Sequence, residues 1–339
     1  MITPRFARIG VLLAAISCGW PVLAAQKPVE RLLKSATMKF ADKNYVGAIA
    51  DCTRVLELDP ANVEAYGNRA VAKLALRDLT GTIEDSTKAI ALQPTYAPAY
   101  NNRASAKLQL IDAAGALADL DIALRLKPDY TEAFANRGSA RLLVGDLPGA
   151  HADLTEAIKR DPSLVLAHST RGAVRLAGGD LEGALADCDR AIALDPRCGG
   201  AFFNRARIKA TKQDYAGANA DYDQAIALGE DTALARYNRA NNRIRLGDID
   251  GAMADITRSL ELDPRFAPTY VIRGFARKEK GDLDGAITDY TKAIELAPDF
   301  ALAYRNRGEA KKAKGDRFGA MDDFDKALEL EAKQKAPRR

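Results

Sequence analysis

The sequence predicts an all-α protein built as a solenoid of nine short helical repeats, and the main evidence is the spacing of its prolines. They recur every 34 residues, with one interval of 68, at Pro60, Pro94, Pro128, Pro162, Pro196, Pro264 and Pro298. Counting back from each proline gives units at 29–62, 63–96, 97–130, 131–164, 165–198, 199–232, 233–266, 267–300 and 301–332. Each unit has the pattern of a helix, a tight turn and a second helix. Because so short a pair is marginal alone, neighbouring units must stack to bury a continuous apolar seam.

The turn inside each unit is marked by residues that end one helix and start the next. Gly-Asp pairs stand there at 145–146, 179–180, 247–248, 281–282 and 315–316. Gly can adopt the left-handed conformation that ends the first helix, and Asp can cap the second. The closing proline ends the second helix because it cannot continue the backbone hydrogen-bond ladder.

Other positions repeat as well: an early aromatic residue, a small residue four positions later, and Ala in the second helix. Three units show these residues together with the closing proline, as Tyr66/Ala70/Ala89/Pro94, Tyr100/Ala104/Ala116/Ala123/Pro128 and Phe134/Gly138/Ala150/Ala157/Pro162. This pattern resembles the tetratricopeptide repeat (TPR), and the resemblance covers residues 29 to about 332. It implies a right-handed superhelix of paired helices with a concave groove that binds protein segments.

Local departures from the family pattern affect single units. His168 and Arg236 replace the early aromatic residue, Thr82 replaces the first Ala of the second helix, and Ala332 replaces the final proline.

A charged pair recurs in register along the chain. The seventh position of units two to nine is always Arg, a second cation follows four residues later, and the second helix of every unit carries Asp at one matched position. We predict that these Arg and Asp side chains pair between helices as a structural charge ladder, because a bidentate contact would fix helix spacing. The alternative is a stripe that binds phosphate or acids. The ladder residues are Arg69, Arg103, Arg137, Arg171, Arg205, Arg239, Arg273 and Arg307 with Asp85, Asp119, Asp153, Asp187, Asp221, Asp255 and Asp289.

An Asn precedes this Arg in six units, where the family resemblance implies a face of the groove. An amide offers both a donor and an acceptor, which matches the peptide unit of an extended ligand. We therefore predict a peptide-binding role, while the alternative that these amides bond only to a neighbouring helix stays open. Exposed aromatic side chains in the later units would add anchors. The predicted groove residues are Asn68, Asn102, Asn136, Asn204, Asn238, Asn306, Phe203, Tyr237 and Phe275.

The sequence gives no sign of catalytic chemistry. His151 and His168 are the only histidines, they lie in different units, and no metal-ligand spacing surrounds them. No phosphate-binding Gly-rich loop stands apart from the repeat, so we expect no cofactor, no metal and no enzymatic activity. A formal charge of +4 over 339 residues also argues against nucleic acid as a partner.

The first 25 residues have the organisation of a secretory signal peptide. Arg5 and Arg8 form a basic start, an apolar stretch covers 9–16, and small residues close the segment at 24–25. The rest of the chain has no stretch apolar enough to span a membrane. We therefore expect an exported protein, periplasmic or secreted. In the alternative, Cys18 lies in a lipoprotein-type box and anchors the chain in the cell envelope.

These features together predict an exported scaffold or adaptor that binds an extended polypeptide segment in its concave groove. The alternative is a structural component of the envelope that associates with itself. The last residues, 333–339, form a basic tail.

Overall fold

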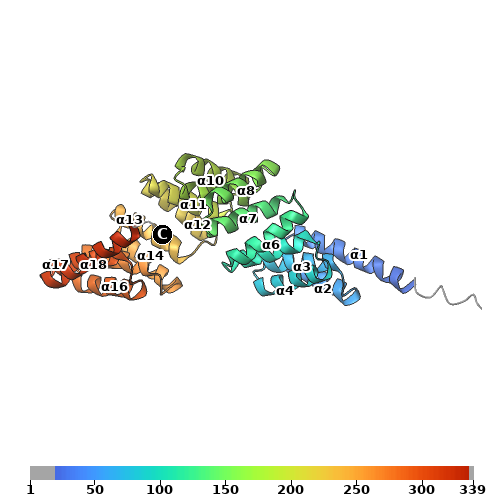
Figure 1. Ribbon diagram of the computed structural model, residues 1–339, viewed down its shortest axis with the longest axis horizontal. Coiled ribbons are helices and arrows are strands. Elements are labelled where there is room, and N and C mark those ends of the chain that lie inside the picture. The colour runs from blue at the N-terminus through green and yellow to red at the C-terminus, as the bar shows by residue number, and fades with distance from the viewer. Residues whose placement is uncertain (1–19, 336–339) are drawn as a thin grey trace, which may run out of the picture. The chain divides into compact units, whose positions relative to one another are not determined.

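The computed structural model describes residues 20–335, and every element in this part of the chain is an α-helix (Figure 1). Most of the predicted signal peptide (1–25), Cys18 and the end of the basic tail lie outside the described residues. The chain divides into two compact units at residue 162, which we call the N-unit (up to Pro162) and the C-unit (from Ser163). Each is described by itself.

The N-unit consists of eight helices in four consecutive hairpins, and each helix packs on its sequence neighbours. The helices are α1 (Trp20–Ala41), α2 (Tyr45–Leu58), α3 (Val63–Ala75), α4 (Leu79–Leu92), α5 (Ala97–Gln109), α6 (Ala113–Leu126), α7 (Thr131–Leu143) and α8 (Leu147–Arg160).

The C-unit continues the same pattern with ten helices in five hairpins. They are α9 (Val165–Ala177), α10 (Leu181–Leu194), α11 (Gly199–Thr211), α12 (Tyr215–Ala227), α13 (Ala233–Arg245), α14 (Ile249–Leu262), α15 (Ala267–Glu279), α16 (Leu283–Leu296), α17 (Ala301–Ala313) and α18 (Arg317–Lys335). In both units the first helix of a repeat also contacts the first helix of the next, as α3 contacts α5 and α11 contacts α13. The predicted all-α repeat solenoid is confirmed.

A side-chain cap starts the second helix of each repeat. In α6 the carboxylate of Asp112 accepts a hydrogen bond of 2.9 Å from the N–H of Gly115. A Cβ atom on Gly115 would lie 2.1 Å from an oxygen of that carboxylate, so glycine leaves room for the cap. The same cap and the same glycine recur from α4 to α18.

The turns between paired helices use the left-handed backbone conformation. Gly145 has φ of 81°, and the other Gly-Asp turns are similar. In four repeats a residue other than glycine adopts this conformation, at Lys43, Arg77, Ile111 and Gln213, where φ lies between 57° and 66°. For the β-branched Ile111 this conformation is strained.

Small residues on the first helix of a repeat allow large ones on the second to pack closely. In the C-unit a Cβ atom on Gly274 would lie only 2.7 Å from the ring of Tyr290, which is fully buried. In the N-unit Ala104 packs in one core cluster with Leu120. The alternation of small and large side chains therefore sets how closely the helices of each hairpin approach.

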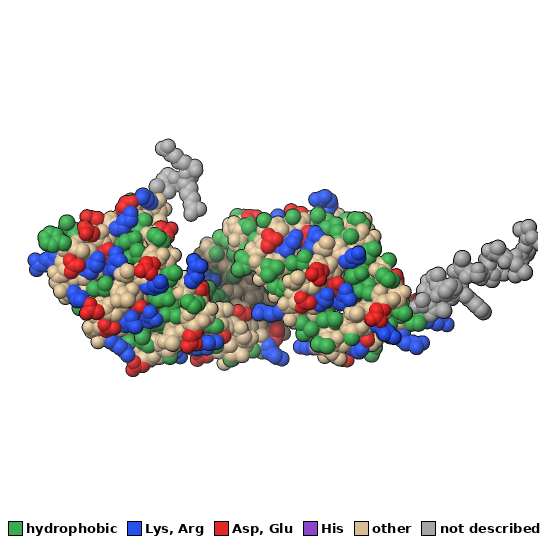
Figure 2. Space-filling view, turned by 90° about the horizontal axis from the view of Figure 1, so that it is seen from below, with side chains coloured by type: hydrophobic (Ala, Val, Ile, Leu, Met, Phe, Trp, Pro, Cys, Tyr) green, Lys and Arg blue, Asp and Glu red, His purple; other side chains and the backbone are tan. Residues whose placement is uncertain are grey.

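The surface carries charges of both signs. Figure 2 shows acidic and basic side chains interspersed over the visible face. No helix within residues 20–335 is long and apolar enough to cross a membrane.

Candidate functional site

Each ladder arginine binds an aspartate of its own repeat through two hydrogen bonds. In the third repeat, Nε and Nη2 of Arg103 donate to the two oxygens of Asp119 at 2.9 and 2.6 Å. Nζ of Lys107, one turn further along α5, lies 2.7 Å from the same carboxylate. Asp119 is buried, so its charge is matched by two cations inside the hairpin.

All eight ladder arginines pair with the aspartate of their own repeat, Asp323 of the last repeat included, and in each case the cation four residues after the Arg contacts the same carboxylate. The pairs are Arg69–Asp85, Arg103–Asp119, Arg137–Asp153, Arg171–Asp187, Arg205–Asp221, Arg239–Asp255, Arg273–Asp289 and Arg307–Asp323.

The third guanidinium nitrogen reaches back to the preceding repeat. Nη1 of Arg137 donates to Asp121 at 2.8 Å, and Nη1 of Arg103 donates to the hydroxyl of Thr87 at 3.2 Å. Its hydrogen bond with Asp153 raises the pKa of Arg137. A guanidinium occupied on both sides is poorly available to an external anion, which favours the structural role over an anion-binding stripe.

Three of the six predicted groove amides donate to the preceding first helix. Nδ2 of Asn102 donates to the carbonyl oxygen of Gly67 at 3.3 Å, and Nδ2 of Asn204 to that of Ser169 at 3.2 Å. Nδ2 of Asn136 donates to Oδ1 of Asn101 at 2.8 Å. These amides join neighbouring repeats, as the structural alternative expects.

The other three predicted amides lie in different surroundings. Asn68 lines a small cavity of about 130 Å³ beside Phe40 and Val71 in the N-unit. Asn306 is half-buried on α17. Asn238 lines a larger cavity in the C-unit.

The predicted aromatic anchors are half-buried and engaged in packing. The ring of Phe203 meets that of Tyr222 edge-on, with centroids 5.8 Å apart. The ring of Tyr237 meets that of Phe266 in the same way at 5.5 Å. Nζ of Lys278 lies 5.4 Å from the ring centroid of Phe275. Phe203 and Tyr237 therefore fill space between helices, and less of their ring surface is open to a ligand than the sequence suggests.

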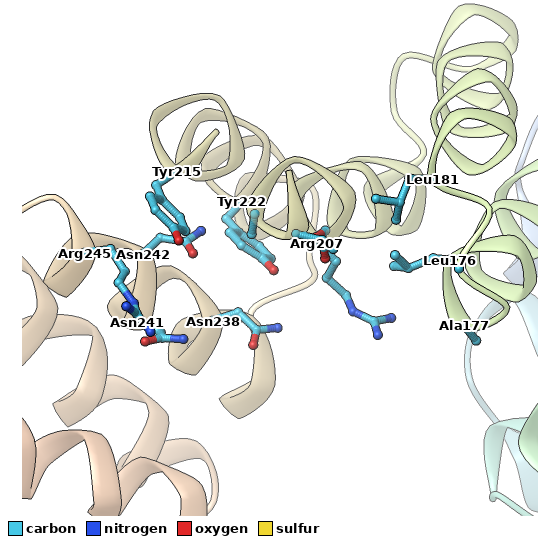
Figure 3. A pocket seen from close by; sticks show the side chains of 13 residues that line it. Leu176, Ala177, Leu181, Arg207, Tyr215, Tyr222, Asn238, Asn241, Asn242 and Arg245 are labelled. Atoms are coloured by element: carbon cyan, nitrogen blue, oxygen red, sulfur yellow. The ribbon is translucent and has the colours of Figure 1, made fainter. Parts of the chain in front are cut away.

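The larger cavity, which we call the C-unit pocket, has a volume of about 620 Å³ and is formed mainly by the first helices of three successive repeats, α9, α11 and α13 (Figure 3). Tyr215 and Tyr222 of α12 and residues at the turn after α9 complete it. Its lining residues are Leu176, Ala177, Gly179, Leu181, Arg207, Ala210, Thr211, Tyr215, Tyr222, Asn238, Asn241, Asn242 and Arg245.

The C-unit pocket is polar, basic and rich in amides. It contains two arginines and three asparagines and no acidic residue. Nδ2 of Asn242 is buried and has no hydrogen-bond partner. Burial raises the pKa of Tyr222, so its hydroxyl stays protonated. The pocket wall therefore offers donors and positive charge.

Sequence reasoning missed most of this pocket. Only Asn238 was among the predicted groove residues. A usable signal exists in the ninth position of each repeat, where Ser105, Ser139 and Ala173 are small but Arg207 is charged. A cation that breaks a run of small residues on one face marks a surface with its own chemistry.

Residues that commonly bind metals are not clustered in the described part of the chain. No group of three or more His, Cys, Asp or Glu side chains among them is placed to hold a metal ion. His168 lies beside the ladder, with Nδ1 3.5 Å from Asp187.

Consecutive hairpins that stack through their first helices define the chain as a helical repeat solenoid. Two family models, described as "TPR repeat" and "Tetratricopeptide repeat", match residues 274–315 and residues 136–197 and 203–265, respectively. The chain belongs to the tetratricopeptide repeat proteins, as the sequence pattern predicts. No match to a curated protein was found.

Solved structures of the same fold include the Cut9–Hcn1 hetero-tetramer of the APC/C, with a TM-score of 0.71 and 17% identity over 82% of this chain and 55% of that one. The protein thus spans little more than half the length of the chain that it matches in that complex. Yeast Tom70 is similar over 91% of this chain and 77% of its own, with 22% identity and a TM-score of 0.46. MamA has 26% identity over 48% of this chain and 95% of its own, with a TM-score of 0.43.

Proposed function

We propose that this protein is a non-enzymatic scaffold that binds an extended segment of another protein against the first helices of its repeats. Proteins of this family generally act as protein-interaction scaffolds. The observation that carries the proposal is the C-unit pocket, where three asparagines of one helix meet a cavity of about 620 Å³. Amides match both the donor and the acceptor of a peptide unit, so a backbone can be held without regard to its side chains.

The test is a pair of matched substitutions. Thr211 lines the pocket on α11, whereas Thr257 is exposed on the second helix α14, and each hydroxyl donates to the carbonyl four residues earlier. Thr211→Trp fills the cavity, and Thr257→Trp adds the same ring outside it. Peptides selected from a displayed random library on the wild-type protein should lose affinity for the first variant only. Equal affinity for both variants would refute binding in this pocket.

A second candidate is self-association through the last helix, and one observation favours it. Leu124 in the third repeat is 7% exposed because the next hairpin covers it, whereas Leu328, at the matched position of the last repeat, is 61% exposed. Met321 on the same helix is exposed too. Light scattering with size-exclusion chromatography, on wild type and on Leu328→Glu, tests this candidate. A monomer at every concentration excludes it.

We also propose that the protein is exported. The support is the basic, apolar and small-residue order of residues 1–25, and envelope anchoring through Cys18 is the alternative. Mass spectrometry of the mature N-terminus after expression in a bacterial host separates the two. A chain that begins near residue 25 supports cleavage, one that begins with acylated Cys18 supports anchoring, and an intact Met1 contradicts both.

A further inference from the structure

We propose that the C-unit pocket selects an acidic segment, whose carboxylates pair with Arg207 and Arg245. This inference rests on the proposed function and names the chemistry of the partner. Its basis is a difference between arginines that lie two residues apart on the same helices.

On α11, Arg205 is bound on both sides, by Asp221 at 2.7 Å and Asp189 at 2.7 Å. Two residues later, Arg207 has no carboxylate within 4 Å among the described residues, and its guanidinium lies 6.0 Å from the ring centroid of Phe203. The helix therefore carries one neutralised arginine inside the hairpin and one uncompensated arginine on the pocket wall.

The next first helix repeats the arrangement. On α13, Arg243 lies 2.7 Å from Asp255, whereas Arg245, two residues later, has no carboxylate within 4 Å among the described residues. The lining of the pocket supplies no acid either. Two positive charges thus face one cavity without a counter-charge, and a ligand that brings carboxylates would supply it.

The amides of α13 favour a peptide as the carrier of these carboxylates. Asn238, Asn241 and Asn242 line the same cavity, and the buried Nδ2 of Asn242 is a donor without an acceptor. A peptide carbonyl or a carboxylate oxygen would satisfy it. A nucleic acid is disfavoured, because the formal charge of the chain is only +4 over 339 residues.

Figure 3 places Arg207 and Arg245 on opposite sides of Tyr222 and Asn238. They come from neighbouring helices, whose axes in packed pairs lie roughly 10 Å apart. Side chains at alternate positions of an extended strand point the same way and lie about 7 Å apart. Arg245 also stands four residues further along α13 than Arg207 does along α11, which adds about 6 Å along the helix axis. The pocket therefore fits acidic residues that lie two or four positions apart on one face of an extended segment.

The experiment uses fluorescein-labelled (Glu-Ser)5, whose carboxylates stand at alternate positions, with (Gln-Ser)5 as its neutral match. Fluorescence anisotropy on the full chain should show that the acidic peptide binds about tenfold or more tightly than the neutral one, with affinity falling as salt rises. The double variant Arg207→Gln/Arg245→Gln should lose that preference. Both side chains are exposed and have no carboxylate partner among residues 20–335, so circular dichroism should show a nearly unchanged melting curve.

The matched control removes the same charge elsewhere. Arg190 and Arg197 are exposed in the C-unit, outside the pocket lining. Arg190→Gln/Arg197→Gln should bind (Glu-Ser)5 within about twofold of wild type. An equal loss in both double variants would overturn the proposal, because it would reduce the effect to net charge. Labelled (dT)10 that binds as tightly and with the same dependence on Arg207 and Arg245 would also overturn it.

The outcome also separates this inference from the proposed function. If library peptides bind in a manner that Thr211→Trp abolishes but (Glu-Ser)5 binds no better than (Gln-Ser)5, the acidic preference is wrong and the scaffold function stands. If no peptide shows binding sensitive to Thr211→Trp, both fail.

Discussion

Arg137 and Asp153 form a two-point contact between the helices of one repeat, with Nε and Nη2 of the arginine 2.9 and 2.8 Å from the two carboxylate oxygens. The remaining Nη1 binds Asp121 of the preceding repeat at 2.8 Å. One side chain therefore fixes both the geometry inside a hairpin and the register between hairpins. Because the second to ninth repeats all have this arginine, its contacts with aspartate recur at the same interval as the apolar packing between helices.

The two aspartates bound to Arg137 should contribute unequally to stability. The side chain of Asp153 is 5% exposed and that of Asp121 is 55% exposed. Asp153→Asn leaves Arg137 and Arg141 without their shared counter-charge in a partly buried site, so we expect the free energy of unfolding to fall by about 3 kcal/mol. Asp121→Asn removes an exposed pair and should cost under about 1 kcal/mol.

Urea denaturation followed by circular dichroism measures both variants. The two variants can be compared directly, since each removes one of the two carboxylate charges that contact the guanidinium of Arg137. Equal losses would mean that burial does not decide the strength of the ladder.

Close packing of Gly274 on Tyr290 gives a second prediction. A Cβ atom there would stand 2.7 Å from the tyrosine ring, which has no free space because the residue is fully buried. We expect Gly274→Ala to lower the free energy of unfolding by about 1–3 kcal/mol through overpacking, although Ala is the better helix former. Gly178→Ala is the control, because its Cβ atom would meet only ordinary contacts at 3.6 Å. Thermal melting that destabilised both variants equally would contradict the packing argument.

Ile111 should be a site where glycine stabilises the protein. Its φ is 62°, and the residue is 77% exposed. The left-handed backbone conformation therefore costs free energy that burial of the side chain does not offset. Five other repeats have Gly at the matched turn position. We expect Ile111→Gly to raise the free energy of unfolding by about 1 kcal/mol, measured by urea denaturation. Ile111→Val keeps the β-branch and should leave stability nearly unchanged, so a gain in both variants would point to a cause other than strain.

The fold was predictable because its determinants are local and repeated. A proline at every 34th residue and a Gly-Asp turn fix where helices end, whatever packs around them. The recurring glycine in the first turn of the second helix, exemplified by Gly115, was not explicable from spacing alone. Its cause is the reach of the Asp112 carboxylate to a backbone N–H, a relation visible only in three dimensions.

The site was less predictable, because identical residue types have different neighbours. Asn204 and Asn238 occupy the same repeat position, yet the first donates to a neighbouring helix and the second lines the pocket. Phe203 packs on Tyr222, a residue that becomes its neighbour only after folding. Arg207 and Arg245 differ from the ladder arginines because no carboxylate lies within 4 Å of them among the described residues. The sequence does not show which carboxylates lie close to an arginine after folding.

The acid sensitivity of the last repeat gives a fourth prediction. Burial alone would raise the pKa of Asp323, but the hydrogen bonds from Arg307 and Lys311, at 2.7 and 2.9 Å, outweigh it and lower the pKa below its usual value. A carboxylate whose folded pKa lies below its unfolded value, about 3.9, adds stability that is fully present above that value. The contribution is lost as the pH falls through the folded pKa.

We therefore expect Asp323→Asn to be less stable than wild type at pH 7 and to lose less of its stability between about pH 4 and pH 2. Urea titrations at several pH values across this range give the slope of stability against pH, which should be shallower by up to one proton. Asp322→Asn is the control, because Asp322 is exposed on the same helix. If the wild-type slope persisted in Asp323→Asn, the carboxylate at the end of the ladder would not be the group whose protonation weakens the fold in acid.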